Sequence, residues 1–266
     1  MKFLSFITEV ARGAGKIARE ESEKIRSGNH EVELSRKSSK DLVTETDKRV
    51  EDYIISRILD KFPSHDIFGE ETGTTDKGSS YTWIIDPIDG TTSFVHGQPF
   101  FSVSIALYKN KLPLAGAVYA PVLDELFTAE KGAGSFLNGR KITVSSADRL
   151  IDSVLATGFA CLRADLPENN LPYFNRIAPV IRGIRRYGSA ALDLAYVAAG
   201  RLDGFWELNL KPYDIAAGIL LVMESGGEIC DFDHAEAYPE NGIIATNGKI
   251  TDELISCMKG TAESDR

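Results

Sequence analysis

Apolar residues recur at helical spacing in two segments near the N-terminus. In residues 3–27 they stand every three or four positions, which is the pattern of an amphipathic helix. The same spacing predicts a second helix over 45–62. Thr44 followed by Asp47 resembles a capping box at its start.

Short apolar segments follow the second helix and are separated by turn signals such as Asn138-Gly139. Their length and their β-branched and aromatic residues indicate strands. The predicted strands span 66–69, 82–86, 100–108, 115–119, 125–130 and 141–144. We expect them to form an antiparallel sheet.

The pattern changes near residue 149, where strands and helices begin to alternate. Strands are predicted over 153–158, 183–187, 204–207, 228–231 and 243–245, and helices over 172–181, 190–199, 215–224 and 251–258. No linker, repeat or low-complexity segment interrupts the chain. We therefore expect one domain over 1–266, with an N-terminal half of about 1–148 and a C-terminal half of about 149–266. Its fold class is α/β, with helices and sheets stacked in alternate layers so that both faces of both sheets are buried.

Composition and charge restrict the class of protein. The chain has 266 residues and a net charge of −9, which argues against a nucleic-acid scaffold because such proteins present a basic face. No apolar run approaches the length of about 20 residues that a membrane span needs. The three cysteines are far apart and form no CxxC pair, so we expect reduced, buried thiols in a cytoplasmic protein.

Acidic residues recur where predicted strands end or helices begin. Glu70 and Glu71 follow one strand, Asp86 ends the next, and Asp214 begins a helix. Taken singly, these residues fit a solvated loop, a turn and a helix N-cap. Taken together, they lie at the places from which side chains converge on a crevice.

The ligand types favour a hard cation. Carboxylates suit Mg²⁺, whereas zinc requires clustered thiolates or imidazoles, and the histidines His30, His65, His96 and His234 are scattered. We interpret these histidines as surface or packing residues. A metal would also let an acidic site bind phosphate, because two like charges 4 Å apart repel by about 4 kcal/mol at an effective dielectric constant of 20.

The segment after Asp86 combines a second acid with a possible anion site. Asp89 stands three positions later with the Ile88 carbonyl between the two. The amides of Gly90, Thr91 and Thr92 come next. If these residues begin a helix, its N-terminus favours an anion such as phosphate.

The motifs in their order resemble the inositol monophosphatase family. They are DLVTETD (41–47), GEE (69–71), DPIDGTTSF (86–94), GSAALDLAYVAAG (188–200) and KPYDIAAG (211–218). The resemblance extends over nearly the whole chain. It implies Mg²⁺-dependent, lithium-sensitive phosphomonoesterases with an αβαβα sandwich fold, commonly homodimers.

The resemblance also implies roles for individual residues. Glu70, Asp86 and the Ile88 carbonyl correspond to ligands of a first metal, Asp86, Asp89 and Asp214 to ligands of a second, and Glu70 to a contact of a third ion. Glu71 supports these ligands. Asp47 and Thr91 correspond to the pair that orients and deprotonates the attacking water. Gly90, Thr91 and Thr92 correspond to phosphate-binding residues, Gly188, Ser189, Ala190 and Glu207 to residues on the alcohol side, and Lys37 to a lysine lining the site.

Two residues depart from the family pattern, and a third has a simpler interpretation. Tyr213 stands where the family often has tryptophan, and Ser93 stands where asparagine is usual. We expect Tyr213 to have a modest effect on the fit of metal or substrate and Ser93 to cause a small local change, because neither is a proposed ligand. Glu207 ends a predicted strand, where a surface acid would be the simplest interpretation.

Four functions are compatible with these residues. The leading prediction is hydrolysis of inositol 1-phosphate and related polyol phosphates. The same chemistry would serve fructose 1,6-bisphosphate, a nucleotide 3′-phosphate or histidinol phosphate. A regulatory role through a protein partner is a third possibility. A pseudoenzyme is disfavoured because every proposed ligand and the Asp47–Thr91 pair are present.

Overall fold

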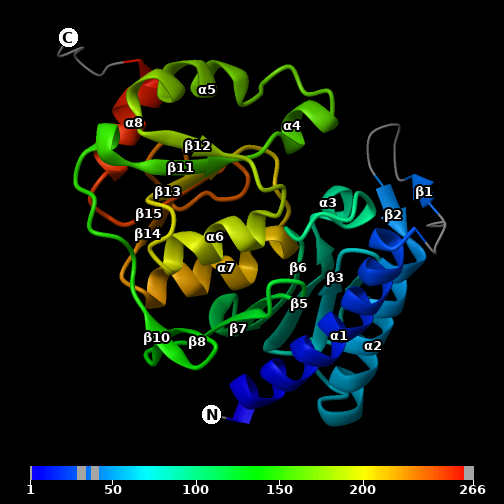
Figure 1. The fold of residues 1–266 in the computed structure, drawn as a ribbon. Helices are drawn as coiled ribbons and strands as arrows, with labels where there is room; N and C mark the ends of the chain where they lie inside the picture. Colours follow the sequence, from blue (N-terminus) through cyan, green and yellow to red (C-terminus); the bar gives the residue numbers. More distant parts are fainter. Residues whose placement is uncertain (1, 29–33, 37–41, 261–266) are drawn as a thin grey trace.

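The computed structural model describes residues 2–28, 34–36 and 42–260 (Figure 1). Its helices are α1 (Lys2–Arg26), α2 (Glu45–Lys61), α3 (Thr91–Val95), α4 (Ala160–Arg163), α5 (Leu171–Ile177), α6 (Ala190–Ala198), α7 (Pro212–Glu224) and α8 (Thr251–Lys259). Short 3₁₀ helices span Leu150–Asp152 and Ala178–Val180. Lys37 and His30 lie outside the described residues, and so does the Thr44 side chain of the predicted capping box.

The larger of two sheets has the strand order β10-β9-β8-β7-β6-β5-β3-β4 within the described residues. Its strands are β3 (Asp66–Gly69), β4 (Gly73–Thr75), β5 (Tyr81–Asp89), β6 (Ser102–Lys109), β7 (Leu112–Ala120), β8 (Glu125–Glu130), β9 (Gly134–Leu137) and β10 (Arg140–Ile142). The smaller sheet has the order β12-β11-β13-β15-β14. Its strands are β11 (Val154–Thr157), β12 (Gly183–Arg185), β13 (Gly204–Glu207), β14 (Glu228–Cys230) and β15 (Ile243–Thr246). A separate hairpin pairs β1 (Leu34–Arg36) with β2 (Leu42–Thr44).

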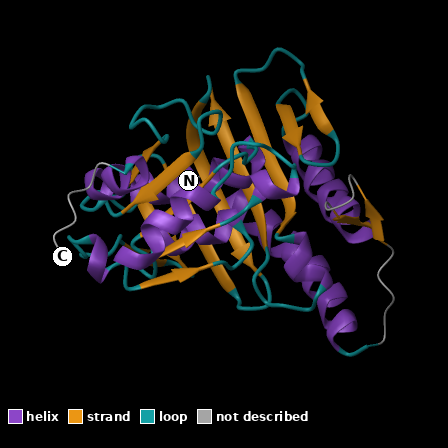
Figure 2. Cartoon of the chain, turned by 90° about the horizontal axis from the view of Figure 1, so that it is seen from above, coloured by secondary structure: helices purple, strands orange, loops and turns teal. Residues whose placement is uncertain are grey.

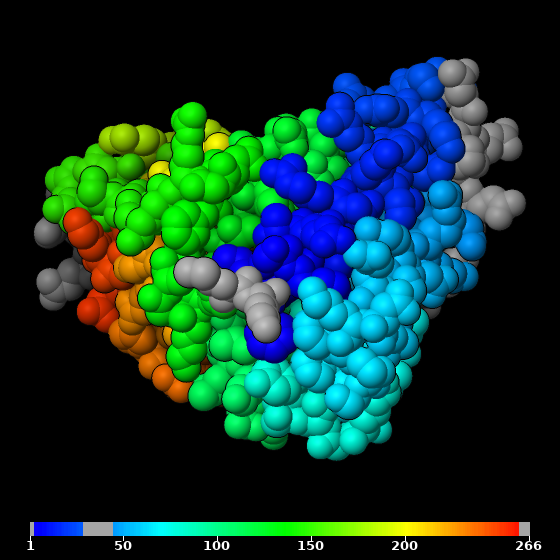
Figure 3. Space-filling model, turned by 90° about the horizontal axis from the view of Figure 1, so that it is seen from below, coloured from blue at the N-terminus to red at the C-terminus, as the bar shows by residue number. Residues whose placement is uncertain are grey.

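The elements stack as alternating layers of helix and sheet. Helices α1 and α2 cover one face of the larger sheet, α6 and α7 lie between the two sheets, and α5 and α8 cover the outer face of the smaller sheet (Figures 1 and 2). Each interface has its own cluster of buried apolar side chains. Seen from below, the N-terminal helix is flanked by the α2 region on one side and by the middle of the chain on the other (Figure 3). The predicted layered α/β fold is confirmed.

The expectation of a wholly antiparallel middle sheet is wrong, because one pair of its strands is parallel. β4 pairs with the outer edge of β3, so the chain crosses back and β5 runs parallel to β3 on its other side. The smaller sheet is also mixed, because β13 and β15 pair antiparallel while β11 and β13 pair parallel.

Several predicted elements have different bounds in the structure, and two of them show a difference at the end of an element. The helix expected over 172–181 ends at Ile177 and continues as a 3₁₀ helix that contains Pro179. Proline lacks the backbone N–H that an α-helix needs at this position. The strand expected over 141–144 is β10 (Arg140–Ile142), at the edge of the sheet.

Small residues bring α7 close to its neighbours. A Cβ added to Gly116 of β7 would lie 3.3 Å from Ala217 of α7, and one added to Gly218 would lie 2.5 Å from Leu194 of α6. Any larger side chain at Gly218 would therefore displace α6 or α7. This close packing holds the first turn of α7 next to the end of β5.

Candidate active site

A bulge near the end of β5 directs two acids to the same side of the sheet. Asp86 pairs with Ser104 and Asp89 with Ser102, so β5 has one more residue than β6 between these pairs. In a regular strand, side chains three positions apart point to opposite faces. The extra residue reverses that relation, and carboxylate oxygens of Asp86 and Asp89 lie within 4.8 Å of each other.

Asp214 reaches the same place from the first turn of α7. Its Oδ2 accepts the backbone N–H of Lys211 at 2.6 Å, which fixes the side chain at the start of the helix. A carboxylate oxygen of Asp214 lies within 4.8 Å of the oxygens of both Asp86 and Asp89. The three acids therefore form one cluster, although Asp214 is remote from the others in sequence.

The carboxyl groups of this cluster all have a raised pKa. Burial, followed by the charge of Glu70 and those of the other two acids, raises the pKa of Asp86 well above its usual range. Burial likewise raises the pKa of Asp89 to about 6, although Ser189 Oγ–H and Ala191 N–H donate to its Oδ2 at 2.5 and 2.7 Å. Burial and the charge of Asp89 raise the pKa of Asp214. A bound cation would relieve this mutual repulsion.

The cluster fits a hard divalent cation. Asp86 Oδ1 is buried and has no hydrogen-bond partner among the described residues, and a buried carboxylate oxygen without a partner is costly. All three convergent side chains offer oxygen atoms, which suit Mg²⁺. A hollow next to them, here called the first hollow, is lined by Glu70, Asp86, Ile88, Asp89, Gly90, Thr91, Thr92, Arg163, Gly188 and Asp214.

The predicted phosphate segment lies at the edge of the first hollow. Gly90 has φ +96°, and a Cβ there would lie 3.0 Å from the carbonyl oxygens of Gly188 and Phe100. Helix α3 begins immediately afterwards at Thr91, and the first N–H groups of a helix have no partner within it. Thr91 Oγ1 donates to the Ile88 carbonyl at 3.3 Å.

A second hollow adjoins the first. It is lined by Asp89, Gly158, Arg163, Arg186, Gly188, Ser189, Ala190, Asp193, Glu207, Leu210 and Asp214. Glu207 is buried at the end of β13 and accepts the Ala160 N–H at 2.9 Å. Burial raises its pKa to about 7, while that hydrogen bond and the charges of Arg163 and Arg186 act in the opposite direction. Glu207 is therefore not the surface acid that its strand-end position allowed.

Of the other predicted residues, Glu70 lines a hollow, whereas Asp47 and Glu71 are not among the lining residues of either hollow. Asp47 is buried in the first turn of α2. Glu70 lines the first hollow, and its backbone N–H donates to Ile85 at 3.2 Å. Glu71 is outside both sets of lining residues and is tied to α2 through its backbone.

Three residues of this region escaped the sequence-based interpretation. Arg163, at the end of α4, lines both hollows, and Arg186 lines the second. Glu51 is fully buried on α2 and accepts the Glu71 N–H at 3.1 Å. An acid on the apolar face of a predicted helix was a signal for Glu51, whereas an exposed arginine without a motif around it gives none.

The two residues that depart from the family pattern both make defined contacts. The ring of Tyr213 packs against Phe68 with a centroid distance of 5.7 Å, so an aromatic residue remains beside the acid cluster. Ser93 Oγ donates to the Tyr187 carbonyl at 3.3 Å, which ties α3 to the segment before Gly188.

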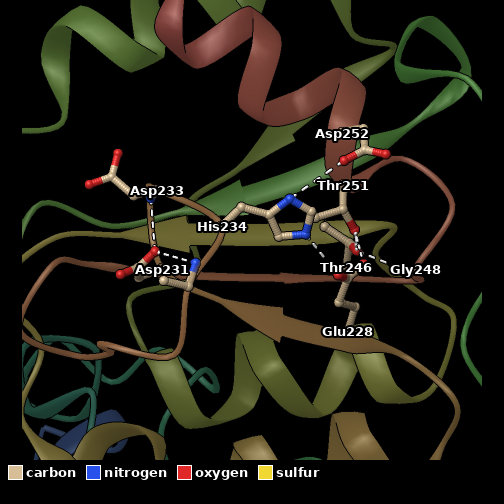
Figure 4. Close-up of polar contacts among 9 residues, drawn as sticks. Glu228, Asp231, Asp233, His234, Thr246, Gly248, Thr251 and Asp252 are labelled. Carbon is tan, nitrogen blue, oxygen red and sulfur yellow. Dashed lines mark hydrogen bonds and ion pairs between the residues drawn. The ribbon is translucent and has the colours of Figure 1, made fainter.

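The described histidines lie away from the acid cluster. His65 stacks between Phe62 and Tyr81, and His96 is exposed just after α3. His234 lies between Glu228 of β14 and Asp252 of α8, at 3.0 and 3.5 Å (Figure 4). These positions agree with surface and packing roles. The three cysteines are buried free thiols, and no helix of the described residues is long and apolar enough to cross a membrane.

Comparisons with known proteins agree with this arrangement. The model of the inositol monophosphatase family matches residues 1–260. An inositol-1-monophosphatase of Mesorhizobium japonicum is 41% identical over 230 residues, covering 86% of each chain. A Nus factor SuhB of Pseudomonas aeruginosa is 41% identical over 263 residues, covering 96% of this chain and 95% of that protein.

The solved structures give the same result. The inositol monophosphatase from Anabaena superposes with a TM-score of 0.85 at 37% identity, covering 98% of this chain and 96% of the other. The likeness in sequence and in fold thus extends over almost the entire chain. This chain therefore belongs to the inositol monophosphatase family.

Proposed function

We propose that this protein is a Mg²⁺-dependent phosphomonoesterase that hydrolyses inositol 1-phosphate and related polyol phosphates. The observation that supports this most is the convergence of Asp86, Asp89 and Asp214 within 4.8 Å. This acid cluster shares the first hollow with the start of α3. A carboxylate cluster and an anion-binding helix start serve a common ligand only if cations lie between the acids and the phosphate.

The residues have distinct tasks in this proposal. Glu70, Asp86, Asp89, Asp214 and the Ile88 carbonyl hold the cations, and Glu71 supports them. When bound, Mg²⁺ neutralises the ester and lowers the pKa of a water molecule. Thr91 orients the attacking water, and Asp47 accepts its proton.

The substrate contacts are divided between the two hollows. The amides of Gly90, Thr91 and Thr92 hold the phosphate oxygens. Gly188, Ser189, Ala190 and Glu207 face the alcohol, and the Glu207 carboxylate accepts hydrogen bonds from substrate hydroxyls. The reaction needs no covalent phosphoenzyme, because water attacks the phosphorus directly. Lys37 is proposed to line the same site.

A phosphate-release panel tests the proposal. The purified protein is assayed on inositol 1-phosphate, fructose 1,6-bisphosphate, a nucleotide 3′-phosphate and histidinol phosphate, with Mg²⁺ and with excess chelator. We expect activity with Mg²⁺ only and the highest kcat/KM on inositol 1-phosphate. Asp89→Asn should abolish turnover, whereas Asp148→Asn, at an exposed acid, should not. Full activity in excess chelator would contradict the metal dependence. A higher kcat/KM on another ester would mean that this ester, and not inositol 1-phosphate, is the preferred substrate.

Further family properties belong to the same proposal. We expect two or three Mg²⁺ ions per site, inhibition by Li⁺, a homodimer, and a cytoplasmic protein of one domain. Isothermal titration gives the ion count, and light scattering gives the oligomeric state. An enzyme indifferent to tens of millimolar Li⁺ would contradict the lithium site.

A second candidate function is suggested by the name of one relative. The Pseudomonas protein is called a Nus factor, which favours a regulatory role through a protein partner. A partner that co-purifies with this chain, and persists with Asp89→Ala, would support that role. The expectation of no nucleic-acid partner rests on net charge, and nuclease treatment of the lysate tests it.

A further inference from the structure

Asn170 stands immediately before α5, where an asparagine usually caps the helix with its side chain. The Asn170 side chain makes no such bond. The neighbouring Asn169 accepts the Leu171 N–H at 3.0 Å instead. Asn170 is fully buried, and a buried amide group needs hydrogen-bond partners. Helix capping therefore does not account for an asparagine at this position.

The amide group of Asn170 joins the ends of two strands. Its Nδ2 donates to the Gly158 carbonyl at 2.6 Å and to Thr157 Oγ1 at 3.2 Å, at the end of β11. Its Oδ1 accepts the Leu208 N–H at 3.2 Å, just after β13. Thr157 Oγ1 in turn donates to the Trp206 carbonyl at 2.6 Å. The two side chains thus form one buried network between β11 and β13.

Glu207 lies between the two segments that this network joins. The bonded Trp206 carbonyl and Leu208 N–H belong to the residues on either side of it. Its carboxylate lies against the other segment, because a Cβ added to Gly158 would overlap both carboxylate oxygens, and its Oε1 accepts the Ala160 N–H at 2.9 Å. The network therefore fixes both the backbone that carries Glu207 and the backbone on which its carboxylate rests.

The network itself stays out of the site. Neither Asn170 nor Thr157 is among the lining residues of either hollow, whereas Glu207 lines the second. Both side chains are buried, so the loss of one partner leaves buried polar groups unsatisfied and disturbs the others. Any effect of these two residues on a ligand in the second hollow must therefore pass through a lining residue.

We propose that Asn170, together with Thr157, is a positioning residue that sets the place of the Glu207 carboxylate and so the preference for esters of hydroxyl-bearing alcohols. This inference rests on the proposed function, in which Glu207 accepts hydrogen bonds from substrate hydroxyls. A misplacement of about 1 Å can cost about 10²-fold in rate. The loss should nevertheless stay below the one to two decades, roughly, that removal of Glu207 itself should cost.

The test compares kcat/KM on inositol 1-phosphate with kcat/KM on p-nitrophenyl phosphate. Thr157→Val keeps the shape of the side chain but removes the hydroxyl, and Asn170→Ala removes the amide. We expect the ratio of the two values, inositol ester over nitrophenyl ester, to fall about 10-fold in each variant. Thr157→Ser keeps the hydroxyl and should restore the ratio. If Asn170→Ala does not fold, Thr157→Val and Thr157→Ser still decide the matter.

Asn169→Ala is the matched control. Asn169 is the same residue type at the start of the same helix, and its side chain bonds only to Leu171 and to the Pro167 carbonyl among the described residues. Its loss should weaken the start of α5 and leave the ratio unchanged. A fall in the ratio equal to that of Asn170→Ala would assign the effect to α5 as a whole and overturn the proposal.

A double-mutant cycle shows whether the network acts through Glu207. In a Glu207→Ala background, Thr157→Val and Asn170→Ala should lower the ratio no further, because the group that they position is gone. Losses that multiply with that of Glu207→Ala would overturn the proposal. So would an unchanged ratio in the single variants, or an equal loss on both esters, which indicates a role in folding alone.

Crystal structures of the wild type and of Thr157→Val separate this inference from the proposed function, because they require no turnover. We expect the Glu207 carboxylate of the variant to move away from the Ala160 N–H, to a separation beyond about 3.2 Å. If the wild type hydrolyses neither ester and the carboxylate moves, the phosphatase proposal fails and the positioning role stands. A Glu207 carboxylate in the same place in both structures would remove the positioning role whatever the activity.

Discussion

The carboxylate of Glu51 accepts the backbone N–H of Glu71 at 3.1 Å and so joins α2 to the turn after β3. Glu51 is fully buried. Burial raises its pKa, while hydrogen bonds from Glu71 and Thr72 act in the opposite direction. A Cβ added to Gly69 would lie 2.2 Å from Glu51 Oε1. The carboxylate therefore lies directly against the backbone that presents Glu70 to the first hollow.

Glu51→Ala should weaken both folding and metal binding. Removing the acceptor leaves the partly buried Glu71 N–H without this partner, which costs about 1–3 kcal/mol of stability, and it frees the turn that positions Glu70. Thermal unfolding and a Mg²⁺ titration of activity measure the two effects. Asp52→Asn, at the next and exposed position of α2, should change neither. Unchanged Mg²⁺ dependence in Glu51→Ala would show that the turn is held by other contacts.

Asp47→Asn and Thr91→Ala should each lower kcat strongly while metal binding persists. Positioning and deprotonation of water by a general base commonly contribute about 10²–10⁴-fold. If the two residues act as a unit, the double variant should be little slower than either single one. Single-turnover kinetics and metal titration make the comparison, and losses that multiply would indicate independent roles.

Glu207→Ala should penalise substrates with hydroxyl groups. A hydrogen bond to a charged group contributes about 1.5–3 kcal/mol, or roughly one to two decades in kcat/KM. We expect this loss on inositol 1-phosphate and a much smaller one on p-nitrophenyl phosphate, which offers no hydroxyl. Equal losses on the two esters would assign Glu207 to the support of the metal site or of the fold.

His65 should make the folded state sensitive to acid. Its Nδ1 accepts the Trp83 Nε1–H at 3.1 Å, and its ring stacks on Phe62 and Tyr81. Burial lowers the pKa of His65 below its usual 6.5, although the charge of Asp66 acts in the opposite direction. The unfolded chain then binds a proton at this histidine more readily than the folded protein does. The contribution of neutral His65 to the free energy of unfolding is therefore complete above pH 6.5 and is lost as the pH falls below that value.

The measurement for His65 is the Tm between pH 7.5 and 5. His65→Phe keeps the stacking but cannot be protonated, so its Tm should fall less on acidification than that of the wild type. His96→Gln removes an exposed histidine and should follow the wild type. Parallel Tm curves for the wild type and His65→Phe would assign the acid sensitivity to other groups.

The sequence by itself determined the features that depend on local spacing. Helical periodicity located α1 and α2, because an amphipathic helix repeats its apolar positions every few residues. The motif from Asp86 to Thr92 indicated paired acids next to an anion-binding segment, and Gly90 indeed adopts a positive φ before α3. The layered fold and the family followed from several such motifs in one order.

Only the tertiary structure decided how these pieces meet. The bulge in β5 that turns Asp86 and Asp89 to one side depends on pairing with β6, and β3 lies parallel to β5 because β4 occupies its other edge. Arg163 and Arg186 reach the second hollow from segments with no motif of their own. Such placements result from strand register and helix packing between distant parts of the chain, and local propensity contains no information about either.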